Sequence, residues 1–534
     1  MTALLKRFFL IAIACVIVPL LGLSLWSSLT EPQITDRLQL YQTDLLLHVS
    51  ELKADRPEDA NLLAARKAVL GDNPLQTALE QYQEVRESAT ENLQKFQAQR
   101  SATPRKRLAS PNSTDAEQPV APTPPLDTTT SPSADVQKQQ MLINQLDLRI
   151  GLLQAQQNNE AAALETWTKL QQAPNTDSSD PSIALAEVLT NLWQEPAQIL
   201  PNAEAQLQKD LDGWFRYVGL ARLYQLQQRT EPLNTLRAEE QQIAQQTLVK
   251  LAAVSTVPAL GALIGVALII GLVIRWLNRS TGADAETLAW QVPWDGEVIA
   301  WVLIVGFFFA GQIAIPGVLG LGSRLLSQLG VSVSLAATVG GRAKAFYTLT
   351  YYLLMSGTGL FVLYRAVKPF APLPPDWFRL AGKRNWFLWG VGGYFVALPL
   401  MFGVSLLNQQ FWQGQGGSNP LLQIVLEEGD PVALLIFFLT AAVAAPIFEE
   451  VLFRGFLLPS LTRYLPVWGA IVASAFVFAL AHLSLSEVLP LATLGIVLGV
   501  VYTRSRGLLA SMLLHSLWNS VTMIGLFILG SGTK

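Results

Sequence analysis

Long uninterrupted runs of apolar residues are the feature that most restricts how this chain can fold. Of its 534 residues, 51% are hydrophobic and only 14% are charged. A run of roughly 20 apolar residues crosses the hydrocarbon core of a bilayer as one helix, which satisfies its own backbone hydrogen bonds. The sequence therefore predicts an all-α, polytopic membrane helix bundle and excludes a soluble enzyme. Eight core spans are expected, at about 252–274, 297–319, 345–367, 384–407, 431–461, 467–483, 487–503 and 507–529.

A ninth apolar run lies at the amino end. Lys6 and Arg7 precede it, and at roughly 20 residues it is long enough to span a bilayer, which indicates a signal-anchor helix over residues 1–30. Basic residues beside a first span favour a cytoplasmic location for that end. Residues 30–250 are then expected outside the cytoplasm. Cys15 is the only cysteine, so disulfides and a cysteine-based zinc site are excluded.

The distribution of basic residues supports this topology. Only Arg324, Arg342 and Lys344 fall on the extracytoplasmic side of the membrane, and the extracytoplasmic loop from 408 to 430 contains no Lys or Arg. The asymmetry fits a bacterial inner membrane or an organelle of bacterial descent. The basic residues placed on the cytoplasmic side are Arg275, Arg279, Arg365, Lys368, Arg379, Lys383, Arg384, Arg463, Arg504 and Arg506.

The extramembrane region divides by composition. Residues 31–100 show apolar residues at spacings of three and four, which predicts helices. Residues 101–135 are rich in Pro, Ser and Thr and cannot bury enough apolar surface to order themselves, so they are predicted to form a disordered linker. The helical pattern returns over residues 136–248. Residues 249–534 form the expected eight-helix membrane domain.

Within residues 136–248, one segment has the spacing of a helical hairpin. Gly151, Ala163 and Trp167 lie where two antiparallel helices of a tetratricopeptide-type unit would touch, and a weaker hairpin is expected from Trp214 onward. A generic helical bundle is the alternative. The extramembrane part as a whole contains one histidine, His48, which lies in the first helical segment, and it shows no cluster of convergent polar groups. A docking or regulatory role that recruits a protein partner is therefore favoured over catalysis, with His48 structural.

Ionisable residues occur at membrane depth in three of the last four spans. Glu449, Glu450 and Arg454 lie inside the apolar stretch 431–461, and charges there are costly enough to mark a functional site. The following spans add His482, and then His515 with Asn519 four residues later. Counted at a rise of about 1.5 Å per residue from the predicted cytoplasmic ends, these groups lie at roughly 12 to 24 Å. They are therefore expected in one layer.

Helical geometry separates the two glutamates. Glu450 and Arg454 are four residues apart on one face, so they are predicted to form a structural ion pair. Glu449 points about 100° away and is the carboxylate left free to act as a general base. His515 and Asn519 share a face and offer two hydrogen-bond donors. Together with His482, these are the groups needed to activate a water and stabilise an oxyanion in amide hydrolysis.

These residues resemble the three motifs of the CPBP family, the type II CAAX prenyl proteases and bacteriocin-processing enzymes. The motifs are Glu449-Glu450-x-x-x-Arg454, Phe478-x-x-x-His482 and His515-x-x-x-Asn519, on successive spans. The resemblance covers about residues 290–530. It implies an eight-helix intramembrane endopeptidase within residues 249–534, in which Glu449 and His482 activate water and His515 and Asn519 form the oxyanion hole. Glu450 and Arg454 match its supporting positions.

Several alternatives stay open. The charged groups could merely lock helices together, or Glu449, Glu450, His482 and His515 could hold zinc, although no cofactor is expected because adjacent helical glutamates diverge. A noncatalytic membrane scaffold or immunity-type protein that recruits partners through its extramembrane helices is the competing function, and a proton-coupled transporter is a third. The expected partners are the lipid bilayer and a membrane-embedded or membrane-delivered peptide, and no nucleic acid.

Overall fold

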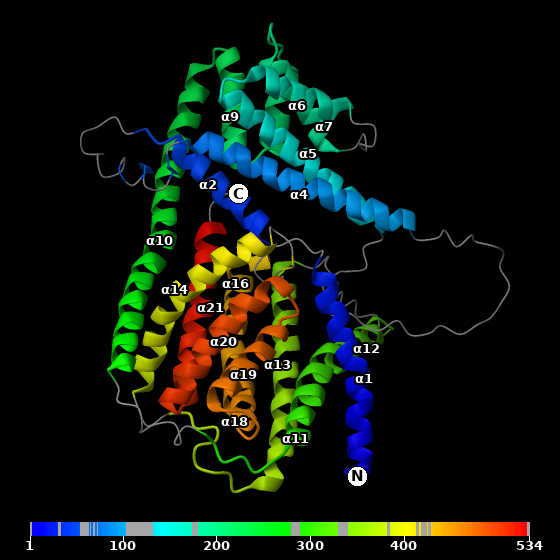
Figure 1. The fold of residues 1–534 in the computed structure, drawn as a ribbon. Coiled ribbons are helices and arrows are strands. Elements are labelled where there is room, and N and C mark those ends of the chain that lie inside the picture. Colours follow the sequence, from blue (N-terminus) through cyan, green and yellow to red (C-terminus); the bar gives the residue numbers. More distant parts are fainter. Residues whose placement is uncertain are drawn as a thin grey trace, which may run out of the picture. The chain divides into compact units, whose positions relative to one another are not determined.

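The described part of the chain is built of helices joined by turns, and it contains no strand (Figure 1). The structure is a computed structural model. It describes residues 3–29, 34–53, 64, 66–67, 70–71, 73–102, 132–172, 180–278, 289–328, 340–381, 385–412, 416–417, 424–425 and 429–530. The all-α fold predicted from the sequence is confirmed.

The chain separates into two compact units. The first, the membrane unit, contains residues up to Ile34 and residues Thr256–Gly530, and the second, the helical unit, contains Thr35–Gln118 and Thr129–Ser255. The two extramembrane segments predicted separately, 31–100 and 136–248, thus belong to one unit. Most of the predicted linker, at 103–131, lies outside the described residues, whereas its first two residues are helical and its last four open the next helix.

The helical unit packs around a core of leucines and aromatic side chains. Asp180 caps the start of α7 (Pro181–Trp193) by accepting a hydrogen bond from the Ser182 N–H at 2.9 Å, directly before a proline at the first helical position. Its helices are α2 (Ile34–Ser50), α4 (Pro74–Ala102), α5 (Pro132–Gln156), α6 (Glu160–Gln172), α7 (Pro181–Trp193), α8 (Ala203–Asp210), α9 (Gly213–Leu226) and the first part of α10 (Thr230–Leu277).

The hairpin of α5 and α6 has the contact predicted from its spacing. Trp167 is fully buried and its indole N–H donates to the Leu148 carbonyl at 3.2 Å. A Cβ atom on Gly151 would lie 2.2 Å from that indole nitrogen, so only glycine allows the two helices to approach this closely. Ala163 is also fully buried. The small and aromatic positions therefore hold the hairpin together.

A second hairpin, between α9 and α10, closes in the same way. In each hairpin the middle residue of a three-residue turn has positive φ, Asn158 at 61° and Gln228 at 55°. In each, the last turn residue donates its N–H five residues back, from Asn159 to Gln154 and from Arg229 to Tyr224. The weaker hairpin expected from Trp214 onward is thus present, and the two turns have the same backbone hydrogen bonding.

His48 has a structural place in the helical unit. Its Nδ1 lies 2.7 Å from Glu240 Oε1, and both side chains are buried. The contact joins α2 to the extramembrane part of α10. A buried charge or polar group needs such a partner, which agrees with the structural interpretation of this histidine.

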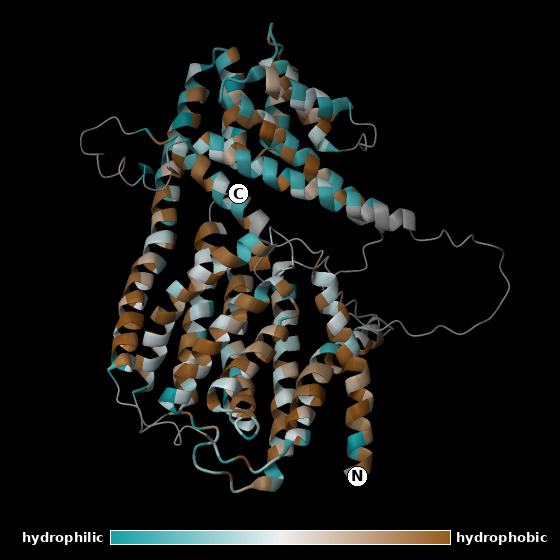
Figure 2. Cartoon of the chain, viewed as in Figure 1, coloured by the Kyte–Doolittle hydropathy of each residue, from teal (hydrophilic) through white to brown (hydrophobic). Residues whose placement is uncertain are grey.

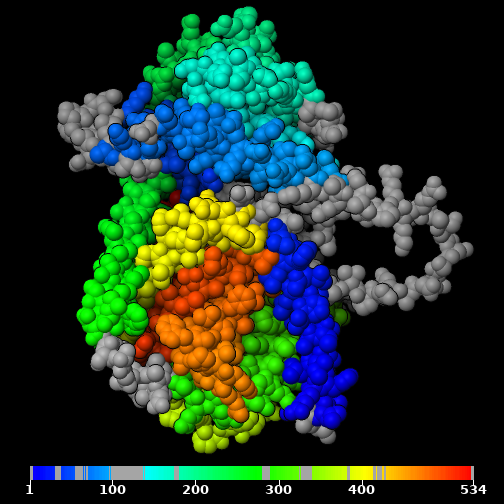
Figure 3. Space-filling model, in the orientation of Figure 1, coloured from blue at the N-terminus to red at the C-terminus, as the bar shows by residue number. Residues whose placement is uncertain are grey.

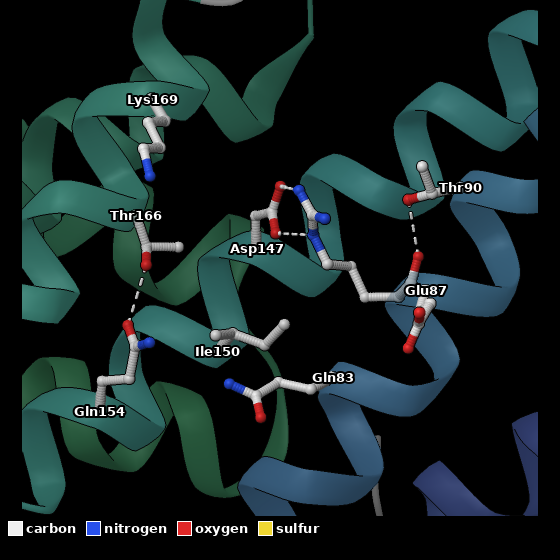
Figure 4. Close-up of a pocket in the computed structure, with 9 residues that line it drawn as sticks. Gln83, Glu87, Thr90, Asp147, Ile150, Gln154, Thr166 and Lys169 are labelled. Atoms are coloured by element: carbon white, nitrogen blue, oxygen red, sulfur yellow. Dashed lines mark hydrogen bonds and ion pairs between the residues drawn. The ribbon is translucent and has the colours of Figure 1, made fainter.

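The helical unit also has an open polar cleft of about 490 Å³ beside α4, α5 and α6 (Figure 4). Among its lining residues, Arg86 makes two hydrogen bonds to Asp147, at 2.6 and 3.2 Å, and Lys169 pairs with Glu165, one turn earlier on α6, at 2.6 Å. No histidine or cysteine lines it. The cleft therefore lacks the histidines that the sequence assigns to the hydrolytic site.

The membrane unit consists of long helices made largely of hydrophobic residues (Figure 2). Many of their aliphatic and aromatic side chains are exposed. Eight helices in the described residues are long and apolar enough to cross a bilayer. One is the predicted amino-terminal anchor, α1 (Ala3–Ser28), and seven coincide with predicted core spans. These are the second part of α10, the helix made of α11, η2 and α12 (Gly296–Gln328), α13 (Gly341–Val367), α14 (Trp386–Trp412), the helix Pro431–Leu461, α20 (Leu485–Ser505) and α21 (Leu508–Gly530).

The remaining predicted span, 467–483, is shorter than expected. It forms α19 (Val467–Leu480), whose 14 residues reach only about 21 Å, less than the roughly 30 Å hydrocarbon core. It packs closely on α20, because Gly495 has no Cβ to collide with the Ala475 side chain, 2.8 Å away from that position. Figure 3 shows this pair beside α14 and α21 on one face. The sequence missed the shortening because the apolar run continues into the turn.

Contacts at one end of the membrane unit involve the turn between α19 and α20. The Leu485 N–H donates to Ser28 Oγ at 3.2 Å, at the carboxyl end of α1. The Ser486 N–H donates to the Gly416 carbonyl at 3.1 Å, in the segment after α14. The sequence-derived topology places these three segments on one side of the membrane, and the contacts agree.

Contacts at the opposite end involve basic residues. Arg7, at the amino end of α1, pairs with Glu297 at 2.8 Å, where the next helix begins. Arg463, in the turn before α19, donates to the Trp294 carbonyl at 2.7 Å. Basic side chains therefore gather at the end that the topology assigns to the cytoplasm.

Candidate intramembrane active site

The helix that carries the glutamates is continuous but irregular. It runs through α16 (Pro431–Leu439), η4 (Thr440–Ala444), α17 (Ala445–Glu449), η5 (Glu450–Leu457) and α18 (Leu458–Leu461), with wide π-helical turns in η4 and η5. Such wide turns often occur at functional sites. Here they lie on either side of Pro446 and Glu449.

Pro446 explains how the last span docks on this helix. The Ala445 N–H donates to the carbonyl five residues back, and Pro446 has no N–H with which to continue that pattern to Ala441. Asn519 supplies the missing donor: its side-chain amide donates to the Ala441 carbonyl at 2.7 Å. Ser516 donates to the neighbouring carbonyl of Ala442 at 2.6 Å. The carbonyl that the proline leaves without a helical donor is thus bound by α21.

Glu450 and Arg454 form the ion pair predicted from their spacing. Arg454 Nη1 lies 2.9 Å from Glu450 Oε1, and both side chains are almost completely buried. The guanidinium also donates to the Gly495 carbonyl at 3.3 Å and lies over the Phe478 ring at 4.4 Å. Glu450 Oε2 and Arg454 Nε have no hydrogen-bond partner. The pair links the glutamate helix to α19 and α20.

His515 lies between the two glutamates. Its Nδ1 is 3.0 Å from Glu450 Oε1, and its Nε2 is 3.8 Å from Glu449 Oε2. Because a carboxylate only accepts, Nδ1 must carry the proton in the first contact. The second separation is longer than a hydrogen bond. His515 is therefore fixed by Glu450 and faces Glu449 with its other nitrogen.

Glu449 is the less buried of the two glutamates. Its side chain is 14% exposed, whereas that of Glu450 is 0% exposed. Its Oε1 accepts a hydrogen bond from the Tyr352 hydroxyl of α13 at 3.1 Å. Neither oxygen is paired with Arg454, as helical geometry predicted. Glu449 thus remains the carboxylate without a cationic arginine partner.

His482 lies in the turn after α19 rather than within a helix. Its Nδ1 is 2.9 Å from the Phe478 carbonyl, one of the last carbonyls of α19. The carbonyl can only accept, so this contact assigns the proton to Nδ1 and leaves Nε2 with its lone pair in the neutral ring. His482 is partly buried, and the positive φ of 58° at Leu483 turns the chain away immediately afterwards.

Phe478 connects the two histidines. Its ring lies 5.0 Å from the His482 ring and 5.8 Å from the His515 ring, edge to face in both cases. Phe453 packs on it as well, at 5.3 Å. The Phe478 ring thus contacts both histidine rings and the Arg454 guanidinium.

The predicted site residues are therefore brought together to different degrees. Glu449, Glu450 and His515 are in direct contact, His482 joins them through Phe478, and Asn519 binds the backbone at Ala441. Sequence reasoning missed two participants, Tyr352 and Ser516. The only signal for Tyr352 was a pair of tyrosines in an apolar span, which is equally typical of helix packing.

The described residues contain no group of three or more His, Cys, Asp or Glu side chains arranged to hold a metal ion. At the candidate site, Glu450 Oε1 is shared by Arg454 and His515. A zinc ion would have to displace one of these contacts to use that oxygen. The oxygen Glu450 Oε1 is consequently already engaged in an ion pair with Arg454 and a hydrogen bond from His515.

Two comparisons with known proteins cover this part of the chain. Residues 431–521 match the family model described as type II CAAX prenyl endopeptidase Rce1-like. YdiL of Bacillus subtilis (strain 168), whose name provisionally describes it as a membrane peptidase, is 24% identical over 137 residues, or 26% of this chain. The match spans 55% of YdiL, just over half its length. No solved structure matches.

The range matched by the family model contains all four residues predicted to be catalytic, Glu449, His482, His515 and Asn519, and both supporting residues. The helical unit lies outside it. Both matches support the resemblance of this part of the chain to the CPBP family.

Proposed function

We propose that this protein is an intramembrane endopeptidase that hydrolyses a peptide bond with a water activated by Glu449 and His482. The observation that carries the proposal is the buried group of Glu449, Glu450, Arg454 and His515 within membrane-spanning helices. So many ionisable groups at membrane depth are costly and mark a functional site. Their match to a protease family supplies the reaction class.

In the proposed reaction, the water lies between the Glu449 carboxylate and His482 Nε2. Glu449 takes a proton from the water as the oxygen forms a bond to the carbonyl carbon of the substrate. The carbonyl oxygen becomes an oxyanion. Glu449 then gives the proton to the amide nitrogen as the carbon–nitrogen bond breaks, and a carboxyl product and an amine product leave. The glutamate is a general base in the first step and a general acid in the second.

The oxyanion needs hydrogen-bond donors, and we assign these to His515 and Asn519. Asn519 keeps a second amide hydrogen beyond the one given to Ala441. His515 donates from Nδ1 to Glu450, so it can donate from Nε2 only as an imidazolium. With His515 charged, two carboxylates balance two cations, His515 and Arg454. That balance lowers the cost of placing the group in the membrane.

The scheme uses no metal ion. The competing zinc mechanism requires a bound ion to activate the water, so it predicts loss of cleavage on dialysis against a chelator and recovery on adding zinc. We expect the cleavage rate to be unchanged by chelation, because the contacts of Glu450 are made with Arg454 and His515.

We further propose that the amino terminus is cytoplasmic and that residues 30–250 lie outside the cytoplasm. The gathering of basic contacts at one end of the membrane unit supports this orientation. The substrate is a membrane-embedded or membrane-delivered peptide, since the site lies in the bilayer. The helical unit would recruit a protein partner or deliver the substrate.

The test compares membrane proteomes from cells that carry the intact protein and its Glu449→Ala or His482→Ala form. We expect a full-length precursor to accumulate in each variant while the variant protein stays at normal abundance. Full cleavage in either variant would rule out the proposed water activation.

One further variant, a deletion of residues 32–246, separates the protease from a noncatalytic scaffold in the same experiment. A scaffold depends on its extramembrane helices, so deletion of residues 32–246 would reproduce the defect and the active-site substitutions would not. A protease loses cleavage in Glu449→Ala with the helical unit intact.

A further inference from the structure

A tyrosine outside the three sequence motifs contacts the proposed catalytic base. The Tyr352 hydroxyl of α13 donates to Glu449 Oε1 at 3.1 Å. We infer that Tyr352 is a positioning residue, which holds the Glu449 carboxylate so that its other oxygen takes the proton from water. This inference rests on the proposed function.

The two helices are held at the distance that this contact needs. Gly359 lies seven residues after Tyr352, on the same face of α13. A Cβ atom there would be 3.1 Å from two carbons of the Phe448 ring and 3.2 Å from the Gly306 carbonyl. The Tyr352 ring itself packs edge-on against Phe448 at 6.2 Å. Phe448 directly precedes Glu449, so the packing of its ring fixes where the carboxylate meets the phenol.

The two oxygens of Glu449 are thereby distinguished. Oε1 accepts from Tyr352, whereas Oε2 faces His515 Nε2 at 3.8 Å, too far for a hydrogen bond. A hydrogen bond to an ionised carboxylate is stronger than one between neutral groups, and this one also fixes the side-chain rotamer. Oε2 therefore keeps free lone pairs, and it is the oxygen that would receive the proton.

The adjacent tyrosine provides a matched control. Tyr351 is also partly buried on α13, but its hydroxyl donates to the Gly311 carbonyl at 2.8 Å, in η2. Each tyrosine thus makes one hydrogen bond to another membrane helix. Only Tyr352 reaches Glu449, so loss of the two hydroxyls should have similar effects on folding and different effects on catalysis.

The experiment measures kcat and KM of the full-length Tyr352→Phe and Tyr351→Phe proteins in lipid nanodiscs. The substrate is the precursor that accumulates in Glu449→Ala cells. Tyr352→Phe should lower kcat by roughly 10- to 100-fold, the range for a lost hydrogen bond to a charged group. KM should not change, because Tyr352 touches the base and not the substrate. Tyr351→Phe should keep wild-type kcat.

A second comparison tests whether Tyr352 acts through Glu449. The carboxylate of Glu449→Asp is one methylene shorter and is withdrawn from the phenol. In that background, adding Tyr352→Phe should lower kcat by less than about twofold, since residues that act together are not additive. An equal loss in both backgrounds would contradict a positioning role.

The remaining outcomes are distinguishable. Wild-type kcat in Tyr352→Phe, with Glu449→Ala inactive, overturns this inference and leaves the proposed function standing. An equal loss of kcat in both phenylalanine variants, with equal loss of thermal stability, also overturns it, because packing then explains the effect. Full activity in Glu449→Ala would refute both the proposed function and the positioning of that residue.

Discussion

The buried ion pair between Glu450 and Arg454 gives a quantitative prediction. The two charges are 2.9 Å apart and both side chains are essentially inaccessible. At that distance and an effective dielectric constant of about 20, their attraction is roughly 6 kcal/mol. Part of this offsets the desolvation of both groups, so the net contribution of the pair is smaller than the attraction. Removing one partner leaves the other charge buried without its main counter-ion.

We therefore expect Arg454→Met and Glu450→Gln each to lower the free energy of unfolding by about 3 to 5 kcal/mol. In Arg454→Met, the Glu450 carboxylate keeps His515 as its basic neighbour. In Glu450→Gln, the guanidinium keeps only the Gly495 carbonyl and the Phe478 ring. The double variant removes both charges, so it should be less destabilised than either single variant.

The assay is reversible unfolding of the full-length protein in mixed detergent and lipid micelles, with all three variants measured under one condition. The difference between the double variant and the sum of the singles gives the coupling energy. Singles within about 1 kcal/mol of wild type, or a double variant equal to the sum of the singles, would refute the reasoning, since 3 to 5 kcal/mol is the usual cost of breaking a buried pair.

Three further predictions follow from particular residues. Gly359→Ala should lower the cleavage rate by pushing α13 from the glutamate helix, whereas Gly357→Ala, with open space at its Cβ, should not; equal rates would contradict this packing. Gly151→Ala should lower the unfolding temperature of the helical unit, measured by calorimetry, and leave that of the membrane unit unchanged. An unchanged unfolding temperature of the helical unit would contradict the close packing of α5 on α6. A hydrogen bond from Arg342 holds the pKa of Asp430 below its usual value, so this contact stabilises the fold above the ordinary aspartate pKa and is lost as pH falls. Unfolding temperatures of wild type and Asp430→Asn should differ at pH 6 and converge only below pH 3.8; a constant difference would contradict the sign.

The ion pair and the hairpin contact could be predicted because they depend on local helical geometry. Four residues along one helix bring Glu450 to Arg454 whatever the surrounding fold. The spacing of Gly151 and Trp167 similarly requires only two antiparallel helices. Apolar runs gave the membrane spans for the same reason, since length and composition suffice to identify a span.

Contacts between helices distant in sequence could not be predicted in this way. The hydrogen bond of Tyr352 to Glu449 depends on the rotation and depth of α13, which no spacing rule specifies. Likewise, the apolar run through His482 gave no sign that α19 ends at Leu480. The backbone carbonyl bound by Asn519 depends on π-helical turns, and a sequence pattern does not distinguish these from α-helical turns.

These differences affect how the site is understood. Asn519 and Ser516 dock α21 on the helix that carries the glutamates, so substitutions there change packing as well as any contact with substrate. The second amide hydrogen of Asn519 is the part of that side chain that bears on oxyanion binding. Glu449 is a cleaner test of chemistry, because Tyr352 binds its Oε1 and the proposed proton acceptor is its Oε2.

The cleavage rate of Glu449→Gln therefore tests the central claim most directly. The substitution keeps the size of the side chain and removes its capacity to accept a proton, and Glu487→Gln, at the start of α20, is the matched control. With the purified full-length protein in nanodiscs and the accumulated precursor as substrate, we predict a rate at least roughly 10³-fold below wild type for Glu449→Gln and an unchanged rate for Glu487→Gln. A wild-type rate for Glu449→Gln would contradict the account.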